Sequence, residues 1–193
     1  RSSDLSPGEF SEPFDQEIDR WRRYVEWVDP GVRYHLLRDG FARLVADRPD
    51  NRAEGIVWGD ARLGNIMVAD DYSVAAVMDW EQPSLGGALH DLGWWLRSDH
   101  NQTSAQGLAP LAGMGSRTET IALWSDVSGK SATDIDWYEA FACFKMECLA
   151  IRMMAIRNMQ LRGEPGSGVR SVKPRMSTSD HPSVAMERVE SSR

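Results

Sequence analysis

The sequence lacks the signatures of several common enzyme classes. It contains no Walker-type phosphate loop, no Gly-x-Ser-x-Gly motif and no group of Cys and His residues at metal-binding spacing. These absences count against P-loop nucleotidases, serine hydrolases and zinc enzymes. An apolar run of about 18 residues is also missing, as is an apolar segment after a basic start, so we expect neither a membrane span nor a secretory signal.

Positive charge is scarce as well. Lys and Arg together number 22 against 29 Asp and Glu, which gives a net charge of −7. Nucleic acids are bound by clustered Lys and Arg, so we expect no nucleic-acid partner. An acidic surface favours a cationic ligand such as an amino sugar or a choline-like amine, although most acidic proteins have no such partner.

Cysteine is nearly absent, with two residues in the chain. Cys143 and Cys148 are five residues apart within one helical pattern, so their side chains point in different directions. They are predicted to be buried thiols in a reducing compartment, and the expected location is the cytoplasm.

The most informative stretch consists of two apolar runs joined by polar loops. Val57–Val68 leads through a loop containing Gly59 and Gly64, the turn 69–73 follows, and Val74–Glu81 forms the second run. Glycine lets the backbone turn sharply and lets a substrate approach closely. The pattern predicts a β-hairpin that carries functional polar residues, and the alternative is a hairpin with ordinary turn residues.

The polar residues of this stretch match the needs of phosphoryl transfer. Asp60 can orient the incoming hydroxyl and accept its proton. Asn65 and Asp79 offer an amide oxygen and a carboxylate, which are suitable ligands for Mg²⁺. Arg62 is the local source of positive charge against the transferring group.

Three motifs in the segment from Gly55 to Trp95 carry a family resemblance. They are Trp58–Asn65 (Trp-Gly-Asp-Ala-Arg-Leu-Gly-Asn), Met78–Glu81 (Met-Asp-Trp-Glu) and Gly86–Gly93 (Gly-Gly-Ala-Leu-His-Asp-Leu-Gly). The segment resembles the aminoglycoside phosphotransferase family of kinase-like small-molecule kinases. That family reads His-Gly-Asp-x-x-x-x-Asn, then Ile-Asp-Trp/Phe-Glu, then Gly-Asp-Pro-x-x-Asp-Leu-Ala. The first motif is similar to an actinobacterial branch of phosphotransferases related to acyl-CoA-dehydrogenase-associated kinases.

The resemblance implies a role for each matching residue. Asp60 would be the catalytic base, Asn65 and Asp79 would bind Mg²⁺, and Asp91 would be a buried organiser of the loop. ATP would be the phosphoryl donor, and a small-molecule hydroxyl would be the acceptor. The implied fold is α+β but mostly α, a protein-kinase-like C-terminal lobe whose small catalytic β-hairpin packs on a helical bundle.

Two departures from the family pattern affect the loop. Trp58 stands where most members have His, which removes a polar side chain from behind the loop. Gly87 and Ala88 replace an Asp-Pro pair, so we expect a looser turn and a less firmly positioned Asp91. Asp91 also falls in the first turn of a predicted helix, where a carboxylate stabilises the helix N-terminus, and this is an equally good reason for its presence.

Hydrophobic spacing predicts helices around the motif segment. The chain is expected to contain a linker at 1–13, the lobe at 14–162 and a disordered tail at 163–193. One of the adjacent Trp94 and Trp95 should face the core, and the other should line the substrate side. The long loop 99–115 is our candidate for substrate contacts. The expected helices cover residues 14–28, 33–46, 89–97, 116–127 and 133–161, and Met146, Met153, Met154 and Met159 of the last helix are expected to fill the core.

The first 55 residues contain no Lys and no Gly-rich loop. A complete kinase-like enzyme carries both in an N-terminal nucleotide lobe. Because the chain also begins at Arg1, we expect a fragment that lacks this lobe and is inactive by itself. The predicted function of the intact protein is transfer of the γ-phosphoryl of ATP to a small-molecule hydroxyl. The alternative is a non-catalytic, truncated kinase-like lobe that binds a metabolite or a protein.

Overall fold

The computed structural model describes residues 12–29, 34–50, 52 and 55–163. The chain divides into two compact units, Arg1–Met154 and Ala155–Arg193. In the second unit the described residues are 155–163, most of which belong to a helix. Nearly all of the predicted linker and tail lies outside the described residues. Among the residues described, no helix is long and apolar enough to cross a membrane.

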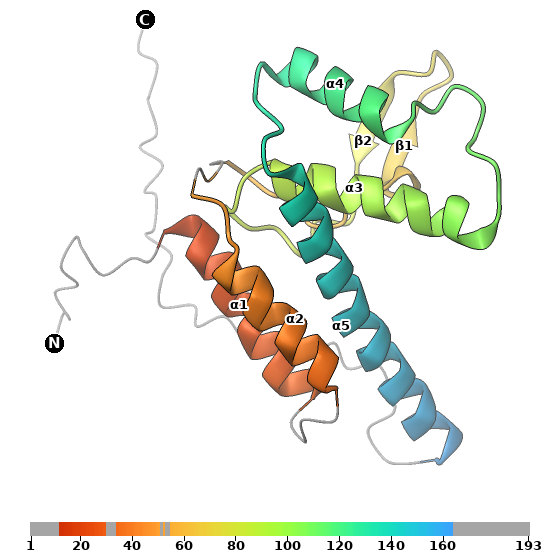
Figure 1. Cartoon of the computed structure of the whole chain (residues 1–193). Helices are drawn as coiled ribbons and strands as arrows, with labels where there is room; N and C mark the ends of the chain where they lie inside the picture. The colour runs from red at the N-terminus through yellow and green to blue at the C-terminus, as the bar shows by residue number, and fades with distance from the viewer. Residues whose placement is uncertain (1–11, 30–33, 51, 53–54, 164–193) are drawn as a thin grey trace, which may run out of the picture. The chain divides into compact units, whose positions relative to one another are not determined.

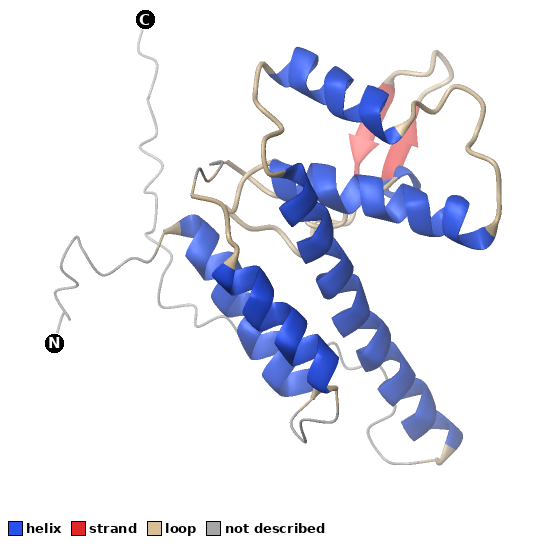
Figure 2. Cartoon of the chain, viewed as in Figure 1, coloured by secondary structure: helices blue, strands red, loops and turns tan. Residues whose placement is uncertain are grey.

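Helices dominate the described chain, and a single small antiparallel sheet accompanies them (Figures 1 and 2). This confirms the predicted mostly helical α+β fold class. The elements are α1 (Pro13–Val28), α2 (His35–Ala46), the 3₁₀ turn η1 (Leu63–Asn65), β1 (Ile66–Val68), β2 (Val74–Val77), α3 (Leu89–Gln102), the 3₁₀ turn η2 (Ser104–Gln106), α4 (Arg117–Ser128) and α5 (Ile135–Leu161).

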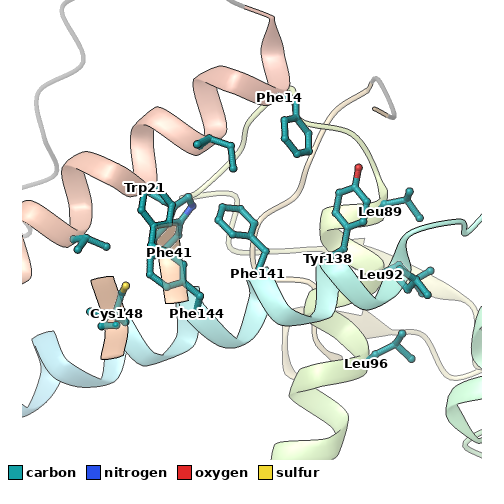
Figure 3. Packing of buried hydrophobic residues seen from close by; sticks show 14 of the residues in the cluster. Phe14, Trp21, Phe41, Leu89, Leu92, Leu96, Tyr138, Phe141, Phe144 and Cys148 are labelled. Atoms are coloured by element: carbon teal, nitrogen blue, oxygen red, sulfur yellow. The ribbon is translucent and has the colours of Figure 1, made fainter. Parts of the chain in front are cut away.

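Helix α1 forms because apolar residues recur at steps of four and three along one face. Phe14, Ile18, Trp21 and Val25 are each at most 3% exposed. They join one hydrophobic cluster with residues of α2, α3 and α5 (Figure 3). Burial of each such side chain contributes about 1.5–3 kcal/mol, so this face fixes the helix against its neighbours.

Helix α5 supplies the aromatic centre of that cluster. Its Phe141 is fully buried, and its Phe144 ring stacks on Phe41 of α2 with ring centroids 4.9 Å apart. The apolar surface of the helix does not stay buried along its whole length. Met153 and Met154 are 70% and 52% exposed. The prediction that these two methionines fill the core is therefore wrong.

Helices α3 and α5 approach each other closely at Gly93. A Cβ atom added there would lie 2.7 Å from the backbone carbonyl carbon of Tyr138. Any side chain would therefore have to push the two helices apart. Glycine at this position allows α3 to lie directly on α5. Helix α3 in turn carries the residues that contact the loop before the hairpin.

The predicted end of α3 was wrong. The helix was expected to stop at Arg97, but it continues to Gln102. Thr103 closes it, because both its backbone N–H and its hydroxyl donate to the carbonyl oxygen of Asp99, at 3.0 and 2.7 Å. Part of the predicted loop 99–115 is therefore helical, and η2 occupies three more of its residues.

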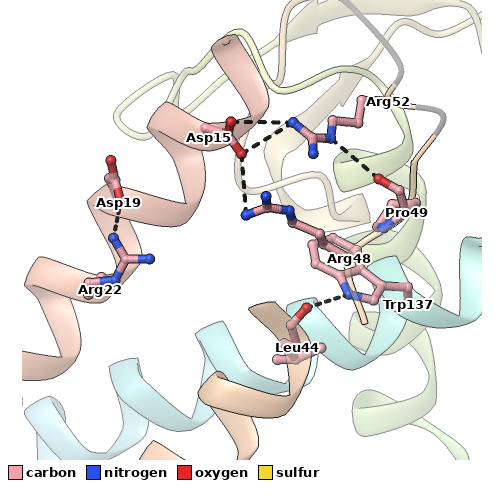
Figure 4. Close-up of polar contacts among 8 residues, drawn as sticks. All are labelled: Asp15, Asp19, Arg22, Leu44, Arg48, Pro49, Arg52 and Trp137. Carbon is pink, nitrogen blue, oxygen red and sulfur yellow. Dashed lines mark hydrogen bonds and ion pairs between the residues drawn. The ribbon is translucent and has the colours of Figure 1, made fainter. Parts of the chain in front are cut away.

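The segment after α2 is fastened to α1 by charge. Arg52 donates from one guanidinium nitrogen to both carboxylate oxygens of Asp15 at 3.3 Å, and Arg48 lies 3.9 Å from the same carboxylate (Figure 4). The indole of Trp137 also donates to the carbonyl oxygen of Leu44 at 3.0 Å. These contacts fix the end of α2 immediately before the motif segment begins.

The predicted hairpin is present. Strands β1 and β2 pair antiparallel with Ile66 opposite Val77, and a bulge interrupts the register at Met67 and Val68. The preceding run at Val57 was expected to be strand-like, but it forms isolated bridges to the segment around Ser84. The sheet of the described chain therefore has two strands.

Candidate active site

Three side chains hold the carboxylate of Asp60. Arg62 Nε and Asn65 Nδ2 donate to Oδ2 at 2.9 and 2.7 Å. Trp94 Nε1 donates to Oδ1 at 2.9 Å. The Asp60 side chain is 17% exposed, so it is oriented from several sides but still open to solvent. The structure thus brings the predicted residues Asp60, Arg62 and Asn65 together.

Asp91 holds the backbone of the same loop. Its Oδ2 and Oδ1 accept hydrogen bonds from the amides of Trp58 and Gly59 at 2.7 and 2.8 Å. Burial raises the pKa of Asp91, although the two amide bonds act in the opposite direction. The family role of Asp91 as loop organiser therefore agrees with the geometry. The replaced Asp-Pro pair does not prevent it, since Ala88 still accepts from the Asp91 amide at 3.1 Å.

The two loop glycines differ. Gly59 has φ of +97°, and a Cβ there would lie 2.3 Å from the carbonyl oxygen of Gln82. Only glycine fits that position without a backbone shift. At Gly64, in contrast, an added Cβ would meet only the end of the long Arg62 side chain, at 2.7 Å. The structure therefore requires glycine at position 59, whereas its requirement for glycine at position 64 is weak.

Asn65 and Asp79 are placed by the hairpin. The amide of Met78 donates to the carbonyl oxygen of Asn65 at 2.8 Å, so Asp79 follows directly after the residue paired with Asn65. Asn65 is buried at 5% exposure, and Asp79 is exposed with φ of +60°. A left-handed backbone is uncommon outside glycine and often marks a functional position.

Asn65 and Asp79 are too few to hold a metal ion by protein side chains alone, but they suit Mg²⁺, which also takes ligands from substrate and water. Within the described ranges, no three His, Cys, Asp or Glu side chains gather into a metal-binding group. The Asn65 amide nitrogen is used on Asp60, which leaves its amide oxygen for a cation. Mg²⁺ is usually held by one or two protein oxygens together with substrate phosphates and waters. The residues present therefore fit that ion.

Trp58 contributes a contact that the sequence did not suggest. Its indole donates to the carbonyl oxygen of Met78 at 2.7 Å, next to Asp79. Trp58 therefore still supplies a polar N–H group at the position where most family members have His. Trp80 lies beside it with ring centroids 6.1 Å apart.

One of Trp94 and Trp95 was predicted to face the core; Trp94 is that residue, and its bond to Asp60 was missed. It is 6% exposed and packs between Ala61 of the loop and Ala142 of α5. A buried indole needs a hydrogen-bond partner. Trp94 also lies three residues after Asp91, on the same face of α3. These two facts together would have pointed to the loop.

A buried ion pair lies beneath Trp94. Lys145 of α5 is 3.8 Å from Oε1 of Glu17 of α1, and both side chains are at most 4% exposed. The Lys145 ammonium lies 5.4 Å from the ring centre of Trp94, and Glu17 also accepts from the indole of Trp21 at 2.9 Å. Burial lowers the pKa of Lys145, while Glu17 and then Asp91 act to raise it. No pattern in the sequence indicated this pair.

A pocket of about 180 Å³ opens beside Arg62. Trp95 lines it together with residues from the end of α3 and from the following loop. The prediction that one tryptophan faces the core and the other faces a possible ligand fits the positions of Trp94 and Trp95. The predicted substrate loop 99–115 also provides part of the lining.

Comparison with known proteins agrees with this geometry. Residues 3–124 match the model of the phosphotransferase enzyme family. A solved structure from Ralstonia eutropha JMP134, titled a "putative aminoglycoside phosphotransferase", is 26% identical with a TM-score of 0.63. The match covers 81% of this chain and 50% of that one, so the chain spans half the length of that relative. Membership of the actinobacterial branch stays a prediction. The chain belongs to the phosphotransferase enzyme family.

Proposed function

We propose that this chain is the acceptor-activating and metal-binding part of a kinase that moves the γ-phosphoryl of ATP to a hydroxyl of a small molecule. The observation that supports this most strongly is the loop geometry. Three donors orient the Asp60 carboxylate, and Asp91 fixes the backbone just before it. A carboxylate oriented in this way is what a positioned general base requires.

Asp60 accepts a hydrogen bond from the acceptor hydroxyl and takes its proton as the new oxygen–phosphorus bond forms, while the bond from the γ-phosphorus to the β,γ-bridging oxygen breaks and ADP leaves. Arg62 has five N–H donors, and the bond to Asp60 uses one of them. Its other donors can stabilise negative charge on the transferring group. Asn65 and Trp94 keep the Asp60 carboxylate in place during the transfer.

Asn65 and Asp79 are the residues that would hold Mg²⁺. When bound, the ion supplies positive charge against the phosphates of the nucleotide. The exposed position of Asp79 leaves its carboxylate open to solvent, where a nucleotide can reach it. The hairpin keeps the two side chains on neighbouring backbone positions.

The test is transfer of labelled γ-phosphoryl from ATP or GTP to a panel of alcohols, in the protein as its source expresses it. Asp60→Asn should lower kcat by about 10²–10⁴-fold, because the base is lost. Nucleotide binding should stay, whereas Asp79→Ala should remove the Mg²⁺-dependent part of it. Asp70→Asn, at an exposed hairpin position, is the matched control and should behave as the wild type. Unchanged turnover in Asp60→Asn would rule out its role as the base.

The same assay decides the alternative of a non-catalytic binding module. Saturable binding of nucleotide or alcohol without any transfer by the wild-type protein would favour it.

A further inference from the structure

We propose that the pocket beside Arg62 binds the acceptor, and that the acceptor is a neutral alcohol with a small apolar body instead of a polycationic amino sugar. This inference rests on the proposed phosphotransferase function, because it identifies the substrate class of that site. It depends on where the pocket lies, on what lines it and on how large it is.

The pocket is connected to Asp60 through Arg62. Arg62 lines the pocket and donates from Nε to Asp60 Oδ2 at 2.9 Å. Asp60 itself is not among the lining residues, so the hydroxyl of an acceptor in the pocket has to extend past Arg62 to reach the proposed base. Trp95, which follows Trp94 in the sequence, lines the pocket as well.

The lining is mainly apolar and carries balanced charge. One guanidinium, Arg62, and one carboxylate, Asp99, are its charged groups, and four other polar or small residues accompany them. An amino sugar with several ammonium groups would find a single carboxylate here, and desolvating its remaining charges against apolar walls is costly. The large apolar residues of the lining are Leu63, Trp95, Leu108, Leu111 and Met114.

The size of the pocket leads to the same class of ligand. Its volume is about 180 Å³. An apolar cavity of about 150 Å³ holds benzene, whereas pockets for drug-sized ligands are roughly 300–1,000 Å³. The pocket therefore accepts one ring or a short chain.

The overall charge of −7 does not alter this conclusion. A negative protein attracts cations from a distance and speeds their encounter with its surface. The groups at the site decide which molecule stays bound. At this pocket those groups are apolar side chains with one charge of each sign.

The experiment measures ligand binding by NMR of the full chain, with the Trp95 indole N–H signal assigned through Trp95→Phe. Benzyl alcohol serves as the neutral probe and kanamycin as the polycationic probe. Benzyl alcohol should shift the Trp95 signal saturably, and kanamycin should not. Leu111→Asp, at a position 60% exposed, should weaken benzyl alcohol binding at least tenfold, because it places a charge in the apolar lining.

Leu123→Asp is the matched control. Leu123 is 63% exposed on α4 and does not line the pocket, so its variant should bind benzyl alcohol as the wild type does. The proposal is overturned if benzyl alcohol gives no saturable shift, if both variants bind equally, or if kanamycin displaces it from Trp95. Circular dichroism of both variants checks that each is folded.

A transfer assay separates this proposal from the proposed function. If benzyl alcohol occupies the pocket but no phosphate ester forms with ATP and Mg²⁺ in the protein as its source expresses it, the kinase function fails and the pocket assignment stands. If phosphate is transferred to kanamycin and not to the neutral alcohol, the kinase function stands and the pocket assignment fails.

Discussion

The hairpin segment and the helices beneath it differ sharply in burial, although both are needed for the site. Met67, Val68 and Val74 of the hairpin are 49–61% exposed, whereas Phe141 and Cys148 of α5 are fully buried. A two-stranded hairpin is marginally stable by itself in water. The residues that we assign to chemistry therefore lie on a segment that cannot order itself.

Helix α3 holds that segment in place through hydrogen bonds. Asp91 holds two loop amides, and Trp94 holds the Asp60 carboxylate. Helix α3 is in turn fixed against α5 at Gly93. The stability of the helices and the geometry of the site are therefore linked through α3, so substitutions in the helical core should also affect the loop that carries Asp60.

The largest expected effect comes from breaking the buried ion pair. Lys145→Met leaves the buried Glu17 carboxylate with only the partly exposed guanidinium of Arg20, 3.6 Å away, as a cation, and should lower the free energy of unfolding by about 3–5 kcal/mol, measured by urea denaturation. Adding Glu17→Gln should restore most of the loss. By contrast, Val74→Thr in the exposed hairpin should change it by at most about 0.5 kcal/mol. Equal effects of Lys145→Met and Val74→Thr would show that the buried helices contribute no more to stability than the exposed hairpin does.

Two helical glycines differ in the space around them, and substitutions there should change stability in opposite directions. Gly93→Ala should lower the free energy of unfolding by about 1–3 kcal/mol, because the new Cβ overlaps the backbone of Tyr138. Gly40→Ala in α2 meets no atom within 4 Å and should instead stabilise by up to about 1 kcal/mol through helix propensity. Thermal unfolding of the two variants gives the comparison. The same sign for both would contradict the close approach of α3 and α5.

A smaller effect should appear as a pH dependence. Burial, and then the charge of Lys145, lowers the pKa of His90 well below its usual 6.5. The unfolded chain therefore takes up a proton near pH 6.5 that the folded chain does not. The free energy of unfolding should fall as pH drops from 6.5 towards about 5, with a slope of up to about 1.4 kcal/mol per pH unit.

The check is denaturation across that pH range for the wild type and for His90→Gln. The variant lacks the titrating group, so its slope should be flatter by the contribution of His90. The same slope in both proteins would show that His90 is not held neutral in the core.

Much of the fold could be predicted because local signals agree with the final packing. The spacing of Phe14, Ile18 and Trp21 gave α1, since one buried face is all that this helix needs. Ser116 and Glu119 form a capping box at the start of α4 with both of its hydrogen bonds present, and this spacing is a local signal for a helix start. Gly129, in the left-handed conformation, closes that helix.

Other features depend on partners that the local sequence does not identify. The pairing of Lys145 with Glu17 joins two helices far apart in the chain, and neither residue has a sequence pattern that names the other. The bond from Trp94 to Asp60 depends in the same way on how α3 lies under the loop. Met153 and Met154 continue an apolar pattern, yet they are exposed, because a pattern does not tell where neighbouring helices end.

The most direct test of the account is amide hydrogen exchange in Asp91→Ala. We expect the amides of Trp58 and Gly59 to exchange roughly 10–100-fold faster than in the wild type, because each loses a hydrogen bond to a charged group. The amide of Phe141 in α5 serves as the internal reference and should change much less. If the Trp58 and Gly59 amides keep their wild-type rates, or quicken no more than that of Phe141, then α3 does not order the loop that carries Asp60.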